Sequence, residues 1–204
     1  MSGVEASLRS ILSDLRAIGA SFAIVGGLAI AVRCEPRLTR DADLVVAVTD
    51  DAEAEELIRT LQKAGYQADA FTEHESRGRL ATVRLTQSAH PEILVDLLFA
   101  SSGIEEEVVR EAEEIEILPG LEAPVARVGH LIALKLLARD DRNRPTDADD
   151  LRSLAAIANE SEWSVASQAV VSITERGYSR GRDLHRALGS LRDEPGNRKA
   201  KPKL

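Results

Sequence analysis

The spacing of apolar residues changes several times along the chain and predicts helices and strands in turn. Between residues 4 and 18 apolar residues recur every three or four positions, as on one buried face of a helix, and Gly19 follows as a stop. Short apolar runs over 22–25 and 41–48 predict strands covered on both faces, because such strands lose the alternation of polar and apolar residues. Further strands are expected over 66–71, 80–86, 93–99 and 115–118, with a loop or hairpin tip over 72–79.

Helical spacing separates these strands and dominates the last third of the chain. Helices are expected over 28–32, 51–63, 104–112, 131–138, 147–158, 165–174 and 184–191. The sequence contains no internal repeat and no low-complexity linker. We therefore predict an α/β (α+β) fold with a mixed central sheet flanked by helices over residues 1–122, a helical subdomain over 123–195, and a disordered basic tail over 196–204.

Composition narrows the class of protein. Hydrophobic residues make up 44% and charged residues 29% of the 204 residues, as in soluble globular proteins, and only 3% are aromatic, so Ala, Val, Ile and Leu must build the core. No apolar run reaches the roughly 18 residues of a membrane-spanning helix, and the first residues lack the features of an export signal. We expect a cytoplasmic protein with no membrane partner. The single cysteine, Cys34, excludes an internal disulfide and a zinc site built from thiolates.

The net charge of −8 argues against a protein that holds nucleic acid by general electrostatic attraction. RNA as a substrate is not excluded, because the basic residues are unevenly distributed. Arg33, Arg37 and Arg40 cluster before residue 41, and the last residues of the chain are again basic.

Two glycines and two carboxylates carry the first chemical signal. Gly26 and Gly27 stand where a buried strand gives way to a helix, so a ligand can approach the backbone and meet free N–H groups, which suits phosphate. Asp41 and Asp43 begin the next strand and project to one side, with Cα atoms about 6 to 7 Å apart. Together these residues fit a nucleoside triphosphate held through magnesium.

The same residues resemble a known signature. Gly26-Gly27, then residues 28–40, then Asp41-x-Asp43 and an apolar residue match the pattern of the DNA polymerase beta-like nucleotidyltransferase superfamily. The extended pattern is most similar to that of the minimal nucleotidyltransferases related to the AbiEii toxins. It reads Gly26-Gly27-x-Ala29 and then Arg37-x-Thr39-x-Asp41-x-Asp43. The resemblance implies a nucleotidyltransferase fold and a place in a toxin–antitoxin or phage-defence system.

Asp96 is a single carboxylate in the otherwise apolar strand predicted over 93–99. An unpaired buried carboxylate costs several kcal/mol, so Asp96 must meet a cation, hydrogen-bond donors or the open end of a site. The resemblance gives it a role, because the family takes its third catalytic carboxylate from a later strand beside the Asp-x-Asp strand.

A second group of charged residues lies in the helical part and resembles the family's second motif. Lys135 could reach a triphosphate as a point charge, although a lysine that lies over the core with its ammonium in water is an equally good interpretation. Asp147 and Asp150 share a helix face and could equally be caps at a helix N-terminus. The group comprises Lys135, Arg139, Arg144, Asp147, Asp150 and Leu151.

The resemblance implies transfer of a nucleoside monophosphate from an NTP, ATP among them, to a hydroxyl, with release of pyrophosphate. The catalytic residues would be Asp41, Asp43, Asp96 and Lys135, and the three carboxylates would hold two Mg²⁺ ions, or Mn²⁺. The expected acceptor is tRNA, another RNA end or a partner protein, and a cognate antitoxin or toxin is an expected partner. The expected nucleotide-binding residues are Gly26, Gly27, Thr39, Arg40, Lys135, Arg139, Asp147 and Asp150.

Four alternatives remain open at this point. Asp41 and Asp43 could be solvated acids at a strand start, or could pair with nearby arginines. The protein could be a nucleotide-binding antitoxin without turnover, or a nucleotidyltransferase that modifies small molecules such as antibiotics. Arg180-x4-His185 resembles the ribonuclease motif of helical toxin domains, but an arginine and a histidine at this spacing are common.

Overall fold

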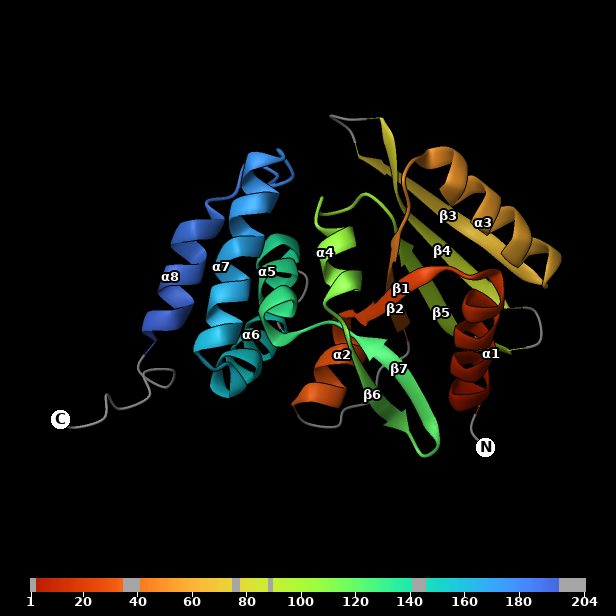
Figure 1. Ribbon diagram of the computed structural model, residues 1–204, viewed down its shortest axis with the longest axis horizontal. Helices are drawn as coiled ribbons and strands as arrows, with labels where there is room; N and C mark the ends of the chain where they lie inside the picture. The colour runs from red at the N-terminus through yellow and green to blue at the C-terminus, as the bar shows by residue number, and fades with distance from the viewer. Residues whose placement is uncertain (1–2, 35–40, 75–77, 88–89, 141–145, 195–204) are drawn as a thin grey trace.

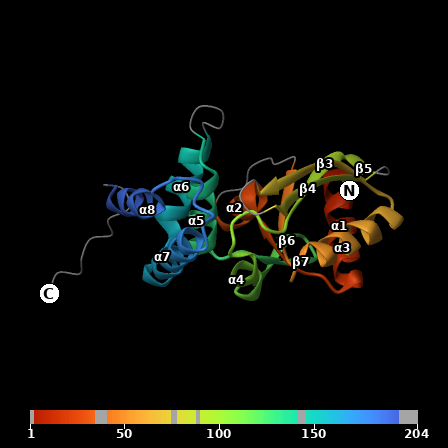
Figure 2. The ribbon, with the colours of Figure 1, turned by 90° about the horizontal axis from the view of Figure 1, so that it is seen from above.

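The computed structural model describes residues 3–34, 41–74, 78–87, 90–140 and 146–194. Within them a mixed sheet of seven strands forms one part of the molecule, and helices α5 to α8 pack together beside it (Figures 1 and 2). The strands are β1 (Ser21–Val25), β2 (Asp41–Ala47), β3 (Tyr66–His74), β4 (Arg79–Gln87), β5 (His90–Leu98), β6 (Glu113–Leu118) and β7 (Leu121–Val125). The helices are α1 (Gly3–Ile18), α2 (Gly26–Arg33), α3 (Asp51–Lys63), α4 (Glu105–Arg110), α5 (Val128–Ala138), α6 (Thr146–Ile157), α7 (Glu160–Glu175) and α8 (Leu184–Asp193).

The pairing of the central strands decides which side chains meet. The strand order is β3-β4-β5-β2-β1-β7-β6, with β2 antiparallel to β1 and parallel to β5. In this register Asp43 stands beside Val25 on one side and beside Asp96 on the other, and Arg84 of β4 stands beside Asp96. Neighbours in register share a face of the sheet, so Asp43, Asp96 and Arg84 are brought to one face.

Helix α1 shows how the apolar pattern becomes packing. Leu8, Ile11, Leu12 and Leu15 are each 4% exposed or less, and α1 packs against β5, β1 and α3. Burial of each such side chain contributes about 1.5–3 kcal/mol relative to exposure. Helix α3 begins as its sequence predicts, since the Asp50 carboxylate caps it by accepting a hydrogen bond from the Glu53 N–H at 3.0 Å.

The helical part is built around α5, in which all but a few side chains are buried. Helix α7 packs closely against it at Gly129, where an added Cβ would lie only 2.4 Å from the backbone oxygen of Glu162. Helix α5 also contacts α2, and the buried apolar residues form one continuous cluster from Leu8 in α1 to Leu191 in α8. The sheet and the helical part therefore share a core.

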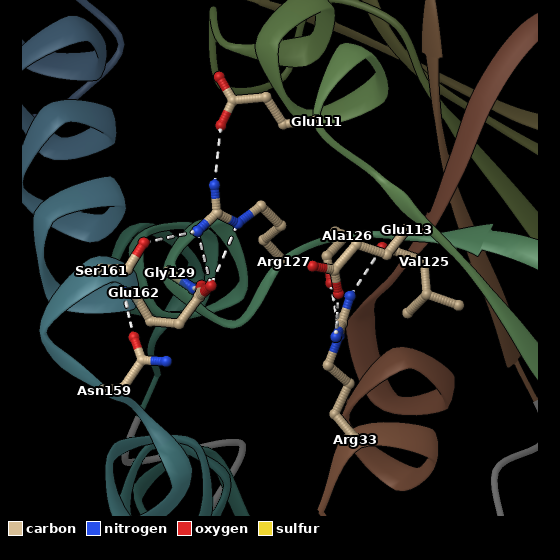
Figure 3. A network of polar contacts seen from close by, with 10 residues as sticks. All are labelled: Arg33, Glu111, Glu113, Val125, Ala126, Arg127, Gly129, Asn159, Ser161 and Glu162. Carbon is tan, nitrogen blue, oxygen red and sulfur yellow. Dashed lines mark hydrogen bonds and ion pairs between the residues drawn. The ribbon is translucent and has the colours of Figure 1, made fainter.

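Two arginines bind polar groups where β7 leads into α5 (Figure 3). The Arg127 guanidinium donates to the Glu162 carboxylate at 2.7 Å and lies 3.5 Å from Glu111, and the Gly129 N–H donates to Glu162 at 2.7 Å. Arg33 donates to the carbonyls of Val125 and Ala126 and to Glu113. Of the arginines that cluster before residue 41, Arg33 fastens α2 to β6 and β7.

The predicted mixed sheet with a helical region is found, and most elements lie where the apolar pattern placed them. Strand β7 was missed, because Pro124 breaks the strand pattern and the segment read as the approach to a helix. The loop expected over 72–79 was too long, since β3 continues to His74 and β4 begins at Arg79. Helix α7 begins at Glu160, five residues earlier than expected, with Asn159 as its cap. Every helix in the described residues is too short or too polar to pass through a lipid bilayer.

Candidate active site

Strand β1 runs directly into α2 at the glycine pair. Gly26 has a φ of +62°, and a Cβ added there would lie 1.9 Å from Oδ2 of Asp43. Any larger residue would therefore meet both backbone strain and a collision with the carboxylate. The Gly27 N–H donates to Asp43. A protein carboxylate thus lies against the glycine pair and accepts from Gly27, whereas the sequence predicted that these N–H groups bind phosphate.

Asp43 is the most perturbed carboxylate of the site. Its pKa is raised from the ordinary 3.8 to about 6, chiefly by burial and then by the negative charges of Asp96 and Asp41, while Lys135 and the Gly27 N–H lower it. Asp41 itself is exposed at the start of β2. Asp43 and Asp96 are neighbouring carboxylates that repel one another at a site partly shielded from water. A bound cation would relieve this repulsion.

Asp96 is held by Arg84. Nε and Nη2 of the guanidinium donate to its two carboxylate oxygens, each at 2.7 Å, and this bidentate pair raises the pKa of Arg84. Among the described residues no group of three His, Cys, Asp or Glu side chains is arranged to enclose a metal ion. A carboxylate offers about four lone pairs, so Asp96 keeps free acceptor positions beside Arg84.

The residues present fit a hard divalent cation on chemical grounds. The donors are carboxylate oxygens, the ligand type that Mg²⁺ prefers, and the carboxyl group of Asp43 is buried within reach of the negative charges of Asp96 and Asp41. Because Gly26 has no Cβ, the Asp43 carboxylate can occupy the space beside it.

Lys135 lies between two buried acids of α6. Its Nζ is 3.0 Å from Oδ1 of Asp147 and 2.9 Å from Oδ2 of Asp150, and the two aspartates are 2% and 5% exposed. Asp147 also accepts a hydrogen bond from the Asp140 N–H at 3.0 Å. The ammonium of Lys135 is therefore fixed inside the protein, and it is close enough to Asp43 to lower the pKa of that carboxyl.

A cavity of about 310 Å³ lies between these groups. Gly26, Gly27, Asp43 and Asp96 line the sheet side, and Lys135 lies among apolar residues of α5 on the other side. Larger hollows of about 500 and 590 Å³ lie elsewhere and contain none of the site residues predicted from the sequence. The cavity is completed by Val25, Ile30, Thr82, Leu98, Ser101, Ser102, Leu131, Leu134, Leu137, Ala138 and Arg180.

Of the remaining predicted residues, the structure describes Arg139. Arg139 is the C-cap residue of α5. Thr39 and Arg40 lie outside the described residues, as do Arg37 and Arg144.

Sequence reasoning missed two residues of this site. Arg84 was read only as an exposed position of an alternating strand, and Arg180 only as half of a ribonuclease motif. Arg180 lines the cavity, whereas His185 is exposed on α8. A possible signal was the turn-forming sequence Ser179-Arg180-Gly181, which places a charged residue where turns favour small ones.

The family model for the nucleotidyl transferase AbiEii toxin of type IV toxin–antitoxin systems matches residues 10–202 of this chain. The chain belongs to this AbiEii family of nucleotidyltransferases. The match spans both the sheet and the helical part.

Solved structures show the same fold as this AbiEii family member. An antigenic nucleotidyltransferase-like protein from Paracoccidioides brasiliensis is 17% identical, with a TM-score of 0.52 and 92% of each chain covered. The antibiotic-resistance factor ANT(2'')-Ia is 17% identical, with a TM-score of 0.55, and the likeness covers 90% of this chain and 93% of that one. No curated protein sequence matches this chain.

Proposed function

We propose that this protein transfers a nucleoside monophosphate from an NTP to a hydroxyl group of an RNA end, tRNA included, in a metal-dependent reaction that releases pyrophosphate. One observation carries the proposal most strongly. Asp43 and Asp96 stand in register on neighbouring parallel strands beside a glycine turn, and burial, together with the charge of Asp96, raises the pKa of Asp43. Arg84 pairs with Asp96, whereas the buried carboxyl of Asp43 keeps a raised pKa although Lys135 and the Gly27 N–H lower it, and such a perturbed acid in a cavity supports a functional site.

Asp41, Asp43 and Asp96 are the residues that would hold Mg²⁺, or Mn²⁺ in its place. The ion, when bound, supplies neutralisation of the charge that develops on the triphosphate. Asp96, oriented by both donors of Arg84, accepts the proton of the attacking hydroxyl or directs that hydroxyl toward the phosphorus. Lys135, fixed by Asp147 and Asp150, adds positive charge to the cavity without needing to reorganise.

Transfer of label tests the reaction and the acceptor together. The purified protein is incubated with Mg²⁺ and each of the four NTPs labelled at the α-phosphate, together with total tRNA, with lysate proteins, or with aminoglycosides and lincosamides. Label in tRNA is the expected result. Label that appears only in protein or only in antibiotic would keep the enzyme class and overturn the proposed acceptor.

Substitution of the paired carboxylates tests the site. Asp43→Asn and Asp96→Asn should each lower the transfer rate by about 10²-fold or more, since metal-bound charge stabilisation is worth several kcal/mol. Asp69→Asn is the matched control, because Asp69 is exposed on β3 and bonds only to Thr86 among the contacts described. Undiminished transfer by Asp43→Asn would rule out the proposed mechanism.

A further inference from the structure

Arg180 stands in a backbone conformation that its side chain does not favour. Among the described residues it alone, apart from glycines, has a positive φ, of 55°. Gly181 follows with a φ of 71°, and the Arg182 N–H donates to the Ser179 carbonyl at 3.0 Å. Two left-handed residues inside such a bond form a type I′ turn, whose first central position normally holds Asn, Asp or Gly. Residues kept in this region despite the strain gather at functional sites.

The turn is fixed from the sheet side. Nη2 of Arg180 donates to the Ser101 carbonyl at 3.0 Å. The segment Ser101–Ser102 is itself rigid, because the buried carboxylate of Glu105 accepts hydrogen bonds from both backbone N–H groups and both hydroxyls. Tyr178 packs so closely on Gly103 that an added Cβ there would lie 2.5 Å from the tyrosine ring. The chain from 178 to 181 is therefore held at the cavity wall.

The Arg180 guanidinium has N–H donors that form no hydrogen bond, and no described carboxylate pairs with it. Arg180 forms no ion pair in the part of the chain that the structure describes. Glu105 acts on it only from a distance and is already bound by the two serines. Arg180 as a whole residue is exposed. Burial of its guanidinium is nevertheless the main cause that lowers the pKa of that group. Of its five N–H donors, the structure shows one that bonds, to Ser101.

We propose that Arg180 binds a phosphate group of the substrate in this cavity. A planar guanidinium with paired free donors recognises phosphate oxygens in a bidentate way, which a lysine cannot do. The cavity that Arg180 lines also contains Asp43, Asp96 and Lys135, so a phosphate held there lies beside the proposed reaction centre. The inference rests on the proposed function for the identity of the substrate. The phosphate belongs either to the NTP or to the acceptor RNA, and the test separates these two sources.

Arg180→Gly is the informative variant, because glycine removes the guanidinium and relieves the left-handed backbone at once. Its melting temperature should equal or exceed that of the wild type, so a loss of binding is not a loss of fold. Arg180→Lys keeps the charge and loses the fork. Arg182→Ala is the matched control, since it removes a neighbouring exposed arginine that does not line the cavity.

Affinity for a non-hydrolysable NTP is measured by direct titration with Mg²⁺ present, and KM is measured for both substrates. If the phosphate is that of the NTP, the Kd and the KM for NTP should rise about tenfold or more in Arg180→Gly, less in Arg180→Lys, and stay unchanged in Arg182→Ala. If the phosphate belongs to the RNA, only the KM for RNA should rise. Wild-type values of all three constants in both Arg180 variants would overturn the proposal.

Direct titration separates this inference from the proposed function. An NTP affinity that depends on Arg180, in a protein that transfers no label to any acceptor, would support the phosphate site and contradict the transfer reaction. The opposite result is transfer that is lost in Asp43→Asn but is normal in both Arg180 variants, with unchanged KM values. It would support the transfer reaction and contradict the phosphate site at Arg180.

Discussion

At the scale of single residues, the most informative quantity is the free energy by which the charged Asp43 destabilises the folded state. Its pKa is about 6 in the folded chain and near the ordinary 3.8 when unfolded. Between these values the folded state binds the proton more tightly, so the free energy of unfolding falls as pH rises through this window, and the loss is complete above about pH 6. The charged form of Asp43 therefore lowers the stability of the folded chain.

Asp43→Asn should therefore be more stable than the wild type in the absence of divalent metal ions. We expect no difference in the free energy of unfolding below about pH 4, and a gain on the order of 1–3 kcal/mol above pH 6, because one pKa unit corresponds to about 1.36 kcal/mol. Urea unfolding in EDTA at several pH values measures this. Asp41→Asn should show a smaller gain, because Asp41 raises the pKa of Asp43 less than burial and Asp96 do. If Asp43→Asn and the wild type were equally stable at pH 7, that result would contradict the raised pKa of Asp43.

Individual residues differ in how far the sequence could place them. Asp41 and Asp43 share a strand face by simple alternation, and Asp96 drew attention as an acid in an apolar run. The partner of Asp96 could not be found in the same way, because Arg84 meets it only through the register of β4 on β5. Arg180 depends on the backbone of a turn, which composition alone does not specify.

At the scale of elements, the junction of β1 and α2 is the most sensitive point. The strand ends at Val25 and the helix begins at Gly26, so the chain turns without a connecting residue. A left-handed φ at Gly26 makes the turn possible, and the lack of a side chain lets β2 bring Asp43 against it.

Gly26→Ala compared with Gly19→Ala should separate strain from collision. Both glycines have a left-handed φ, and each alanine should cost about 1–2 kcal/mol from the backbone. Nothing lies within 4 Å of an added Cβ at Gly19, whereas at Gly26 it meets the Asp43 carboxylate. Thermal unfolding should show the larger loss of stability for Gly26→Ala, and label transfer should fall in that variant alone. Equal losses of stability and equal transfer would mean that the contact with Asp43 is unimportant.

The elements that the sequence predicted best were those with a local cause. Helix α1 follows from its apolar period and Gly19, and α3 from Asp50 as its cap. Strand β7 has no such local cause, since its five residues include Pro124 and it forms mainly by pairing with β6. Its position between β1 and β6 is a property of the whole sheet.

At the scale of the molecule, the cavity depends on the union of the sheet and the helical part. Asp43 and Asp96 come from the sheet, while Lys135 comes from α5 and Arg180 from the turn before α8. The expected division between residues 122 and 123 stays a prediction, and it falls within strand β7. The continuous apolar cluster and the ion pair of Arg127 with Glu111 argue that the sheet and the helical part unfold together.

Trp163 allows this to be tested without any substitution. It is the only tryptophan of the chain, lies in α7 and is 6% exposed, so its fluorescence reports on the helical part alone. Far-UV circular dichroism also reports on α1 and α3, which pack on the sheet. In urea the two signals should change with the same midpoint and slope, because a helical part that shares its core with α2 has no separate stable state. A fluorescence transition at lower urea than the dichroism transition would show that the helical part detaches first. The cavity would then be an assembly of two independently folding units, and binding of a nucleotide that touches both Lys135 and Asp43 should bring the two transitions together.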